Sequence, residues 1–356
     1  MIIETLTLKN FRNHPYLSYE FSPHLNIFDG SNAAGKTNVV EAIHYLSMAR
    51  SFRTTEDIDL ISKGKDKAEI DATCREGNLK RKVKIIITEA GKQIIINGKA
   101  ISKISELSNV MNVLLFEPKD VMMFRGSPKA RRAFIDINLC KKSQPYLDYI
   151  TRYNKVLKER NELLKSGNVD PVLLETTTEM LAKLSGPIVS YRQMYVKDIN
   201  DILIKITRAL TGVKGKLEIN YHPFIEYGKD FQKDALEAFK RAEERDFHQK
   251  ATTIGVHRED FSISLNGRDI GEFGSQGENR IVALALKLSP YFLIDDKDKR
   301  PVVVLDDVMS ELDIDHKKRL IEFVKKFDQV FITATKLEVE GAAHYHINKK
   351  EQKEVF

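Results

Sequence analysis

Residues 30–37 read Gly30-Ser31-Asn32-Ala33-Ala34-Gly35-Lys36-Thr37 and match the pattern GxxxxGK[ST] of a phosphate-binding loop. Polar and apolar residues alternate through residues 1–28, which predicts short strands. After the loop the apolar residues change to helical spacing, at Val39, Val40, Ile43 and Leu46. The octapeptide therefore lies between a strand and a helix, the context that such a loop requires. A chance match on an ordinary strand-turn-helix unit is the alternative, and this context disfavours it.

The loop predicts that the chain binds a nucleotide together with Mg²⁺. Its small residues let backbone N–H groups point inward at phosphate oxygens, and the N-terminus of the next helix adds positive potential. Lys36 is expected to reach the β- and γ-phosphates, and Thr37 to supply a hydroxyl to Mg²⁺. The predicted nucleotide site comprises Gly30, Ser31, Asn32, Ala33, Ala34, Gly35, Lys36 and Thr37.

An apolar strand that ends in two carboxylates is the second element of this site. Pro301-Val302-Val303-Val304-Leu305-Asp306-Asp307 has the form of the Mg²⁺-holding strand beside a phosphate-binding loop. Asp306 would hold Mg²⁺ directly or through water, and Asp307 would orient or deprotonate the attacking water. Alone, a strand ending in Asp-Asp is usually a solvated strand end. Its presence together with the loop favours the functional interpretation.

A second candidate anion site lies at Phe273-Gly274-Ser275-Gln276-Gly277-Glu278-Asn279-Arg280, which an apolar helix follows. Ser275 is expected to be the N-cap of that helix. The arrangement Ser-x-Gly also offers a hydroxyl and free backbone N–H groups at a positive helix end. Ser275 and Gly277 are therefore candidate phosphate ligands.

The remaining periodicity predicts an α/β fold with an inserted helical lobe. Strand-like runs within residues 80–101, with a tight turn at Asn97-Gly98, indicate an antiparallel β layer. Residues 129–250 have helical spacing, with breaks expected at 167–171, 185–187 and 212–215, which leave helices of about 20–25 residues. Strands return near Phe261–Leu265 and Val302–Leu305, so the first and last thirds of the chain are expected to share one sheet.

These elements predict two domains. Residues 1–128 and 255–356 would form a discontinuous ATPase head, and residues 129–254 an α-helical lobe. The chain has 42% hydrophobic residues, a net charge of +6 and two cysteines, Cys74 and Cys140, outside any metal-binding spacing. No signal peptide or membrane span is evident, so we expect a soluble protein of the reducing cytoplasm with no membrane partner.

Several motifs resemble the ABC and SMC class of split-cassette ATPases and, within it, the bacterial RecF family. The class features are the GKT loop, Ser275-Gln276-Gly277, and Ser310-Glu311-Leu312-Asp313 after Asp306-Asp307. Each RecF-like motif is weak, but their ordered set spans nearly the whole chain. These motifs are Lys9-Asn10-Phe11-Arg12-Asn13, Ala49-Arg50-Ser51-Phe52-Arg53, Glu117-Pro118, Arg131-Arg132-Ala133-Phe134-Ile135-Asp136, Gly255-Val256-His257-Arg258 and Ser275-Gln276-Gly277.

In this class the signature serine of one subunit caps the γ-phosphate that the other subunit binds. The resemblance therefore implies an ATP-dependent homodimer in which Ser275, Gly277 and Asp313 act in trans, with Lys36 and Asp307 as further catalytic residues.

The resemblance also implies roles for two flanking pairs of residues. Arg12 and Asn13 would approach the nucleotide, although a plain surface turn explains them equally well. His257 and Arg258 either line the dimer seam or start a strand.

The function implied by the resemblance is that of an ATP-dependent DNA-binding protein of recombinational repair and replication restart. ATP would drive dimerisation of the heads on double-stranded, single-stranded or junction DNA, and weak DNA-stimulated hydrolysis would reset them. Recombination mediator proteins would be its partners in assisting recombinase loading at gaps and junctions.

The chain departs from these patterns at three places. Val256 replaces the usual proline, no glutamine is evident near Glu117-Pro118-Lys119-Asp120, and Thr335 follows the strand Val330–Thr333 where a switch histidine is usual. Slow hydrolysis is therefore expected. A metabolite kinase would have no use for Ser275 or Asp313, and a transporter ATPase would need a membrane partner and the missing glutamine and histidine.

Two basic clusters are candidates for DNA contact, although such clusters are most often solvated faces. No recognition helix or base-stacking platform is evident, so binding should be to the backbone and to shape. The clusters comprise Lys63, Lys65, Lys67, Lys80, Arg81, Lys82 and Lys84, and Arg131, Arg132, Lys141 and Lys142.

Overall fold

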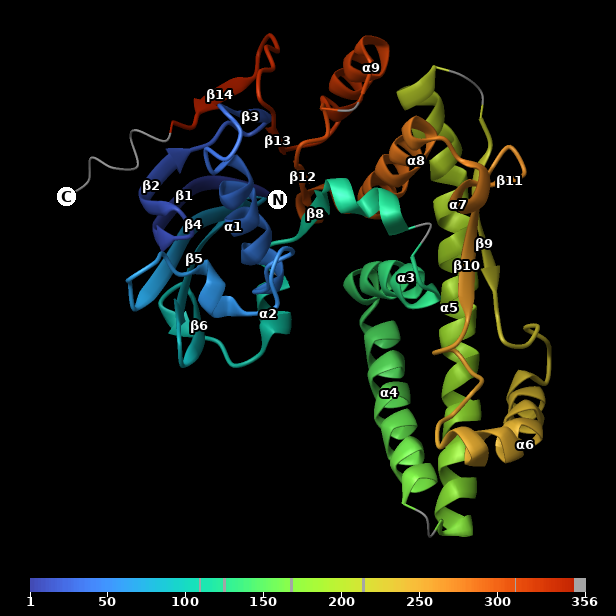
Figure 1. Ribbon diagram of the computed structural model, residues 1–356. Coiled ribbons are helices and arrows are strands. Elements are labelled where there is room, and N and C mark those ends of the chain that lie inside the picture. Colours follow the sequence, from blue (N-terminus) through green and yellow to red (C-terminus); the bar gives the residue numbers. More distant parts are fainter. Residues whose placement is uncertain (109, 124–125, 167–168, 213–214, 311, 349–356) are drawn as a thin grey trace. The chain divides into compact units, whose positions relative to one another are not determined.

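The computed structural model describes residues 1–108, 110–123, 126–166, 169–212, 215–310 and 312–348 (Figure 1). The chain divides into two compact units, one of residues 1–120, 209–213 and 283–356 and the other of residues 121–208 and 214–282. The predicted domain boundaries at residues 129 and 254 stay a prediction. No helix in the described ranges is both long and apolar enough to cross a membrane.

An antiparallel sheet in the first unit has the strand order β2-β1-β4-β5-β6-β7. Asn97 and Gly98 have positive φ angles of 49° and 81° in the tight turn between β6 and β7, as the Asn-Gly pair predicts. The predicted antiparallel layer is therefore confirmed. Its strands are β1 (Ile2–Phe11), β2 (His14–Glu20), β4 (Lys67–Glu76), β5 (Leu79–Thr88), β6 (Gly91–Ile96) and β7 (Lys99–Ala100).

A second sheet of the first unit joins strands from both ends of the chain, in the order β14-β3-β13-β12-β8, with every pair parallel. This confirms that the first and last thirds share a sheet. All four residues of β12 and of β13 are buried, as expected for parallel strands covered on both faces. The strands are β3 (Leu25–Asp29), β8 (Val113–Phe116), β12 (Val302–Leu305), β13 (Val330–Thr333) and β14 (Ala343–His346).

Helix α1 (Lys36–Met48) follows β3 directly and belongs to the same hydrophobic core. Its apolar residues at helical spacing are buried with Phe28, Val304 and Phe331 of the parallel sheet. Burial of one helix face on the sheet therefore positions the loop that connects β3 to α1. The other helices of this unit are α2 (Ile104–Ser108) and α9 (Ile314–Val324), with 3₁₀ turns at Asp57–Leu60, Ser289–Leu293 and Lys297–Lys299.

The second unit is built on four helices, α3 (Pro128–Lys142), α4 (Gln144–Lys165), α5 (Pro171–Thr211) and α6 (Phe231–Gln249). Ser127 and Pro128 begin α3 as an N-cap and an N1 proline, as predicted. Figure 1 shows α4 running beside α5, and the rings of Tyr146 and Tyr191 are 5.7 Å apart between these helices.

The predicted helix break at residues 185–187 is wrong, because α5 continues through it for 41 residues. Proline removes one helical hydrogen bond, but packing against α6 offsets that loss. A side chain at Gly186 would place its Cβ only 3.3 Å from Phe231, so the glycine lets this aromatic ring pack closely on α5. The expected helix length of about 20–25 residues holds for α4, with 22, and fails for α5.

Residues 129–250 are also not wholly helical. β9 (Leu217–His222) pairs with β10 (Asp260–Leu265), which pairs with β11 (Arg268–Asp269) in a separate antiparallel sheet of the second unit. The alternation of buried Leu217 and Ile219 with polar residues was the signal for β9. The strand expected near Phe261–Leu265 exists, but it lies outside the parallel sheet. The predicted Asn266-Gly267 turn is present between β10 and β11.

A buried ion pair fastens α4 to α6. Arg160 and Asp246 are both fully buried, and Arg160 Nη1 lies 2.8 Å from Asp246 Oδ2. Asp246 also accepts hydrogen bonds from the amide and the hydroxyl of Thr253.

We therefore expect Asp246→Ala to lower the free energy of unfolding by about 3–5 kcal/mol, because it leaves the Arg160 charge buried without its carboxylate. Urea denaturation monitored by circular dichroism measures this change. Glu237→Ala on the exposed face of α6 is the control and should cost no more than about 0.5 kcal/mol. Equal losses in the two variants would contradict the assigned role of the pair.

Candidate nucleotide-binding site

The loop from Gly30 to Gly35 requires glycine at both ends. Gly30 and Gly35 have φ angles of 140° and 108°, in the region that disfavours side chains. A Cβ at Gly35 would lie 2.7 Å from the Nε2 atom of His14, and one at Gly30 would lie 2.5 Å from the carbonyl oxygen of Ile347. Close packing by the chain on the two sides therefore fixes the backbone of the loop.

Lys36 begins α1 and folds back over this loop. Its Nζ atom donates to the carbonyl oxygens of Gly30 at 2.7 Å and Ser31 at 2.9 Å. Partial burial lowers the pKa of Lys36, and the carboxylates of Asp307, Asp306 and, less strongly, Asp29 oppose that shift. The ammonium group is therefore held at the mouth of the loop, where incoming phosphate oxygens could replace the carbonyl groups as acceptors.

Asp306 lies at the carboxyl end of β12 and joins three segments of the chain. Its Oδ1 atom accepts hydrogen bonds from Thr37 Oγ1 at 3.1 Å and from Thr333 Oγ1 at 2.7 Å. Burial raises the pKa of this carboxyl group, and the two threonine hydroxyls counteract the shift. Thr333 also accepts a hydrogen bond at 2.8 Å from the amide of Asp307, which has a positive φ of 47°.

The oxygen atoms of Thr37 and Asp306 fit a Mg²⁺ ion. A hard divalent cation prefers such ligands and would offset the cost of burying the Asp306 carboxylate. No group of three or more His, Cys, Asp and Glu side chains in the described part of the chain could hold a metal ion. Magnesium at this position would take its further ligands from water and nucleotide phosphates, as is common for this ion.

The Arg12-Asn13 pair predicted to flank the nucleotide divides between two environments. Arg12 makes a bidentate contact with the buried carboxylate of Glu41, with Nη2 at 2.6 Å and Nε at 2.9 Å. Arg53 also reaches Glu41, at 3.2 Å. Asn13, by contrast, lies over the loop, with Nδ2 3.5 Å from the carbonyl oxygen of Ala34. Arg12 thus ties the β1–β2 turn to α1, and Asn13 faces the loop.

A cavity of about 460 Å³, a size that suits a small-molecule ligand, lies at the loop, and Gly30, Arg12 and Asp306 are not among the residues that line it. Its lining includes the predicted Lys36, Thr37 and Asp307. Sequence reasoning did not assign Thr333, Asn38, Arg53 or the supporting Glu41 to the site. A charged residue on the apolar face of α1 was the available signal for Glu41. The cavity is lined by Asn13, Asn32, Ala33, Gly35, Lys36, Thr37, Asn38, Arg53, Asp307, Thr333 and Thr335.

Ser275 precedes α8 (Gln276–Leu288) and caps it, as predicted. The Ser275 hydroxyl accepts a hydrogen bond from the Glu278 amide at 3.2 Å, and the Ser275 amide donates to Glu278 Oε2 at 2.9 Å. Ser275 and Gly277 are exposed, and a Cβ at Gly277 would meet no atom within 4 Å. The segment is ordered by its own hydrogen bonds and leaves room for another molecule.

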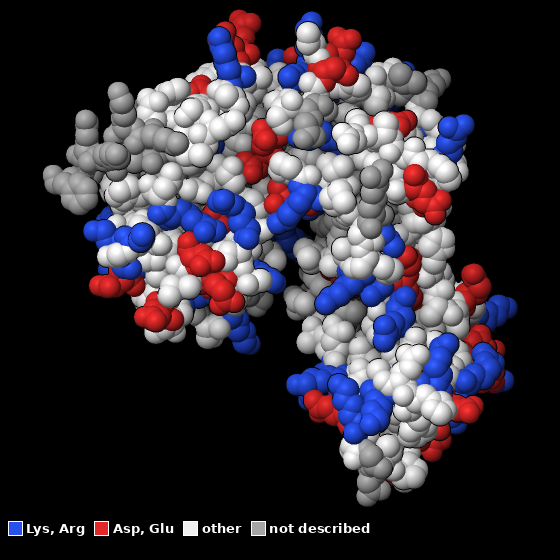
Figure 2. Space-filling view, in the orientation of Figure 1, with Lys and Arg blue, Asp and Glu red and all other residues white. Residues whose placement is uncertain are grey.

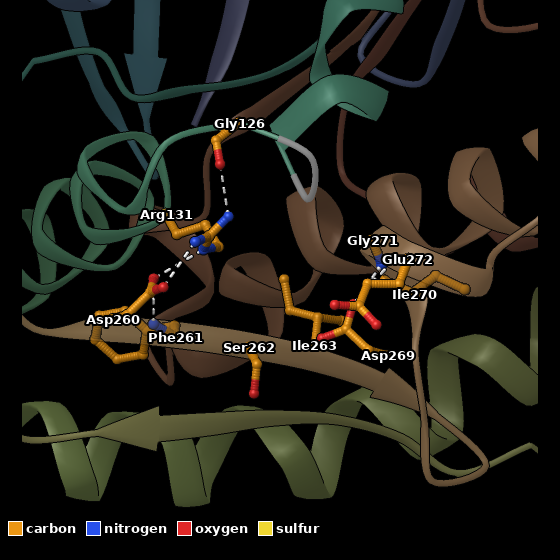
Figure 3. Close-up of a pocket in the computed structure, with 10 residues that line it drawn as sticks. All are labelled: Gly126, Arg131, Asp260, Phe261, Ser262, Ile263, Asp269, Ile270, Gly271 and Glu272. Carbon is orange, nitrogen blue, oxygen red and sulfur yellow. Dashed lines mark hydrogen bonds and ion pairs between the residues drawn. The ribbon is translucent and has the colours of Figure 1, made fainter.

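A cavity of about 380 Å³ lies beside the short helix α7 (Ile270–Phe273), which leads to Ser275 (Figure 3). At one end Arg131 binds both oxygens of Asp260, at 2.8 and 2.7 Å. At the other end Asp269 accepts hydrogen bonds from the amides of Gly271 and Glu272 and so caps α7. The side of this cavity next to the signature segment is therefore acidic.

Asp313 is the N-cap of α9 and is largely exposed. It accepts hydrogen bonds from the His316 amide at 2.9 Å and from His316 Nδ1 at 2.7 Å, and these bonds lower the pKa of Asp313. Glu311 of the same motif lies outside the described residues. His257 contacts the Tyr153 hydroxyl at 2.9 Å and the Thr252 carbonyl oxygen at 3.0 Å, and burial lowers its pKa to about 4. The position of His257 is therefore explained by its hydrogen bonds within the second unit.

Ion pairs occupy much of the two basic clusters. Lys67, Lys80, Arg81 and Lys84 lie within 4 Å of carboxylates. In the second cluster Arg131 binds Asp260 and Lys142 binds Asp198. On the face that Figure 2 shows, acidic and basic side chains are interspersed over the β-rich unit. Several cluster members are therefore less available to phosphates than the sequence suggests.

Comparison with known proteins gives concordant results. The family described as "RecF/RecN/SMC N terminal domain" matches residues 2–355. The chain is 36% identical to the "DNA replication and repair protein RecF" of Clostridium novyi, over 95% of this chain and 94% of the relative. The same identity extends over 95% and 94% of the two chains for a RecF of Clostridium perfringens.

Solved structures agree with these relatives. The recombination mediator protein RecF of the RecFOR pathway, in a structure with ATP, has 30% identity and a TM-score of 0.88 over 98% of this chain and 97% of that one. An Smc head bound to the C-winged helix domain of ScpA has 16% identity and a TM-score of 0.58 over 94% and 90%, and shares the fold alone. The fold is the ABC/SMC-like ATPase head with an antiparallel layer and a helical insertion. Because curated relatives more than 30% identical align with nearly the whole sequence, the chain belongs to the RecF family.

Proposed function

We propose that this protein is an ATP-dependent switch that dimerises on DNA in recombinational repair and replication restart. Each chain would bind MgATP through the loop of residues 30–37, with Thr37 and Asp306 at the metal. Ser275, Gly277 and Asp313 would contact the nucleotide of a second copy. The main support for this proposal is the hydrogen bond from Thr37 to Asp306, which places the loop of residues 30–37 beside a buried carboxylate.

The exposed state of Ser275, Gly277 and Asp313 supports their proposed action in trans. Each lies at or near a helix N-terminus, where backbone donors and the helix dipole favour anions. Asp313 is itself acidic, so it would orient donors or water near the phosphate. The solved structure of a RecF relative with ATP supports ATP as the nucleotide.

Hydrolysis is proposed to be weak and stimulated by DNA. Asp307 lines the nucleotide cavity and would orient or deprotonate the attacking water. Thr335, which replaces the usual switch histidine, lies 3.5 Å from the Asn32 side-chain oxygen. A threonine hydroxyl cannot accept a proton at neutral pH as an imidazole can, so turnover should be slow.

DNA, ATP-dependent self-association and recombination mediator proteins are the proposed partners. A relative is described as a recombination mediator protein of the RecFOR pathway, which supports a role with other mediators in recombinase loading. Membership of the RecF family disfavours both a metabolite kinase and a transporter ATPase.

Two substitutions separate nucleotide binding from dimerisation. Lys36→Arg and Ser275→Arg should both abolish ATP-dependent dimerisation in light scattering. Ser275→Arg should leave ATP binding to the monomer nearly intact, because the serine would serve the nucleotide of the other copy. Ser102→Arg, at an exposed serine outside the motif, is the control and should dimerise normally. A Ser275→Arg protein that dimerises with ATP would contradict the proposal.

DNA affinity should fall steeply with salt. If about four phosphates are neutralised, the association constant should drop on the order of 100-fold between 50 and 200 mM salt. Fluorescence anisotropy with a labelled duplex, in the presence of ATP, measures this dependence. A flat response would argue against binding to the phosphate backbone.

A further inference from the structure

The first turn of α8 uses part of its hydrogen-bonding capacity on one of its own side chains. The Ser275 amide donates to the Glu278 carboxylate, and the Glu278 amide donates to the Ser275 hydroxyl oxygen. This reciprocal arrangement is a capping box. In the proposed function, the backbone amides at this end of α8 bind a phosphate. Two of them, the amides of Ser275 and Glu278, are already hydrogen-bonded within the chain.

The capping group carries a negative charge. Hydrogen bonds from the backbone and side chain of Ser275 lower the pKa of Glu278, so the carboxylate is ionised at neutral pH. Asp269, the N-cap of α7, and Glu272 within that helix add negative charge at the right-hand end of the cavity in Figure 3. Arg131, at the other end of that cavity, is neutralised by Asp260.

We propose that Glu278 is an electrostatic gate on the half-site that receives the nucleotide of a second copy. This inference rests on the proposed function, because it concerns the γ-phosphate that the second copy would bring to Ser275. The Glu278 carboxylate and the phosphate are both anions, and both are suited to accept from the Ser275 amide. A phosphate that docks on that amide would therefore displace the carboxylate.

The hydroxyl of Ser275 is engaged by Glu278 in the same way as its amide. It accepts from the Glu278 amide and donates toward the Glu278 carboxylate, so it becomes available to a phosphate oxygen only when that carboxylate moves away. The exposed position of Gly277 gives a ligand access to the backbone there. Glu278 thus does not block the half-site. It raises the concentration of ATP-bound protein that is needed before two copies associate.

The test compares Glu278→Gln with the wild-type protein at saturating ATP. A glutamine side chain can still accept from the Ser275 amide through its carbonyl oxygen, but it carries no charge. Sedimentation over a range of protein concentrations should give a dimer dissociation constant lower by about tenfold or more, because a symmetric dimer removes two repulsions at once. The difference should shrink as salt rises, since added ions screen exposed charges.

Glu244→Gln, at an exposed glutamate of α6, makes the same change in net charge and should leave the dissociation constant unchanged. Thermal unfolding of each variant establishes that it is folded. A folded Glu278→Gln protein that dimerises no more tightly than wild type would overturn the gate alone. If neither protein dimerises although both bind ATP, the proposed function fails, and the gate fails with it.

Discussion

The hydrogen bonds to one buried carboxylate, Asp306, connect the parts of the candidate site. Thr37 comes from the helix after the phosphate loop, Thr333 from the end of β13, and Asp306 from the position after β12, with β13 lying between β3 and β12 in the sheet. Parallel pairing in the order β3-β13-β12 brings the carboxyl ends of these strands to one edge of the sheet. A charge buried in this way is tolerated because it is hydrogen-bonded on two sides. The same arrangement leaves it suited to a cation.

Much of this site could be predicted because its signals are local. The loop needs glycines and a lysine at fixed spacing, and β12 is an uninterrupted apolar run that ends in two aspartates. Thr333 could not be found in this way, because nothing in the sequence around it differs from an ordinary strand end. Its role arises only from the strand order. Glu41 is similar, since its partners Arg12 and Arg53 belong to other segments.

The incorrect predictions about the fold have a common physical origin. Ser185-Gly186-Pro187 is a strong local signal for a break, yet the aromatic ring of Phe231 fills the space that the glycine leaves. β9 is short and lies within a helical region, so its alternation was outweighed by the surrounding pattern. In both cases contacts between distant segments overrode the local preference. The bounds of β12 agree with the expected strand Val302–Leu305, and α4 ends at Lys165, just before the break expected at residues 167–171.

The distance in sequence between Thr37 and Asp306 has a consequence for biosynthesis. The two residues are separated by 269 positions. Three of the strands in the parallel sheet, β12, β13 and β14, are also the last three strands of the chain. At about 5–20 residues per second, a ribosome needs roughly 15 to 50 seconds to add the intervening chain. During that time the loop has been translated, but Asp306, the carboxylate that accepts from Thr37, has not. The candidate site is therefore completed late in translation, after the whole of the second unit has been made.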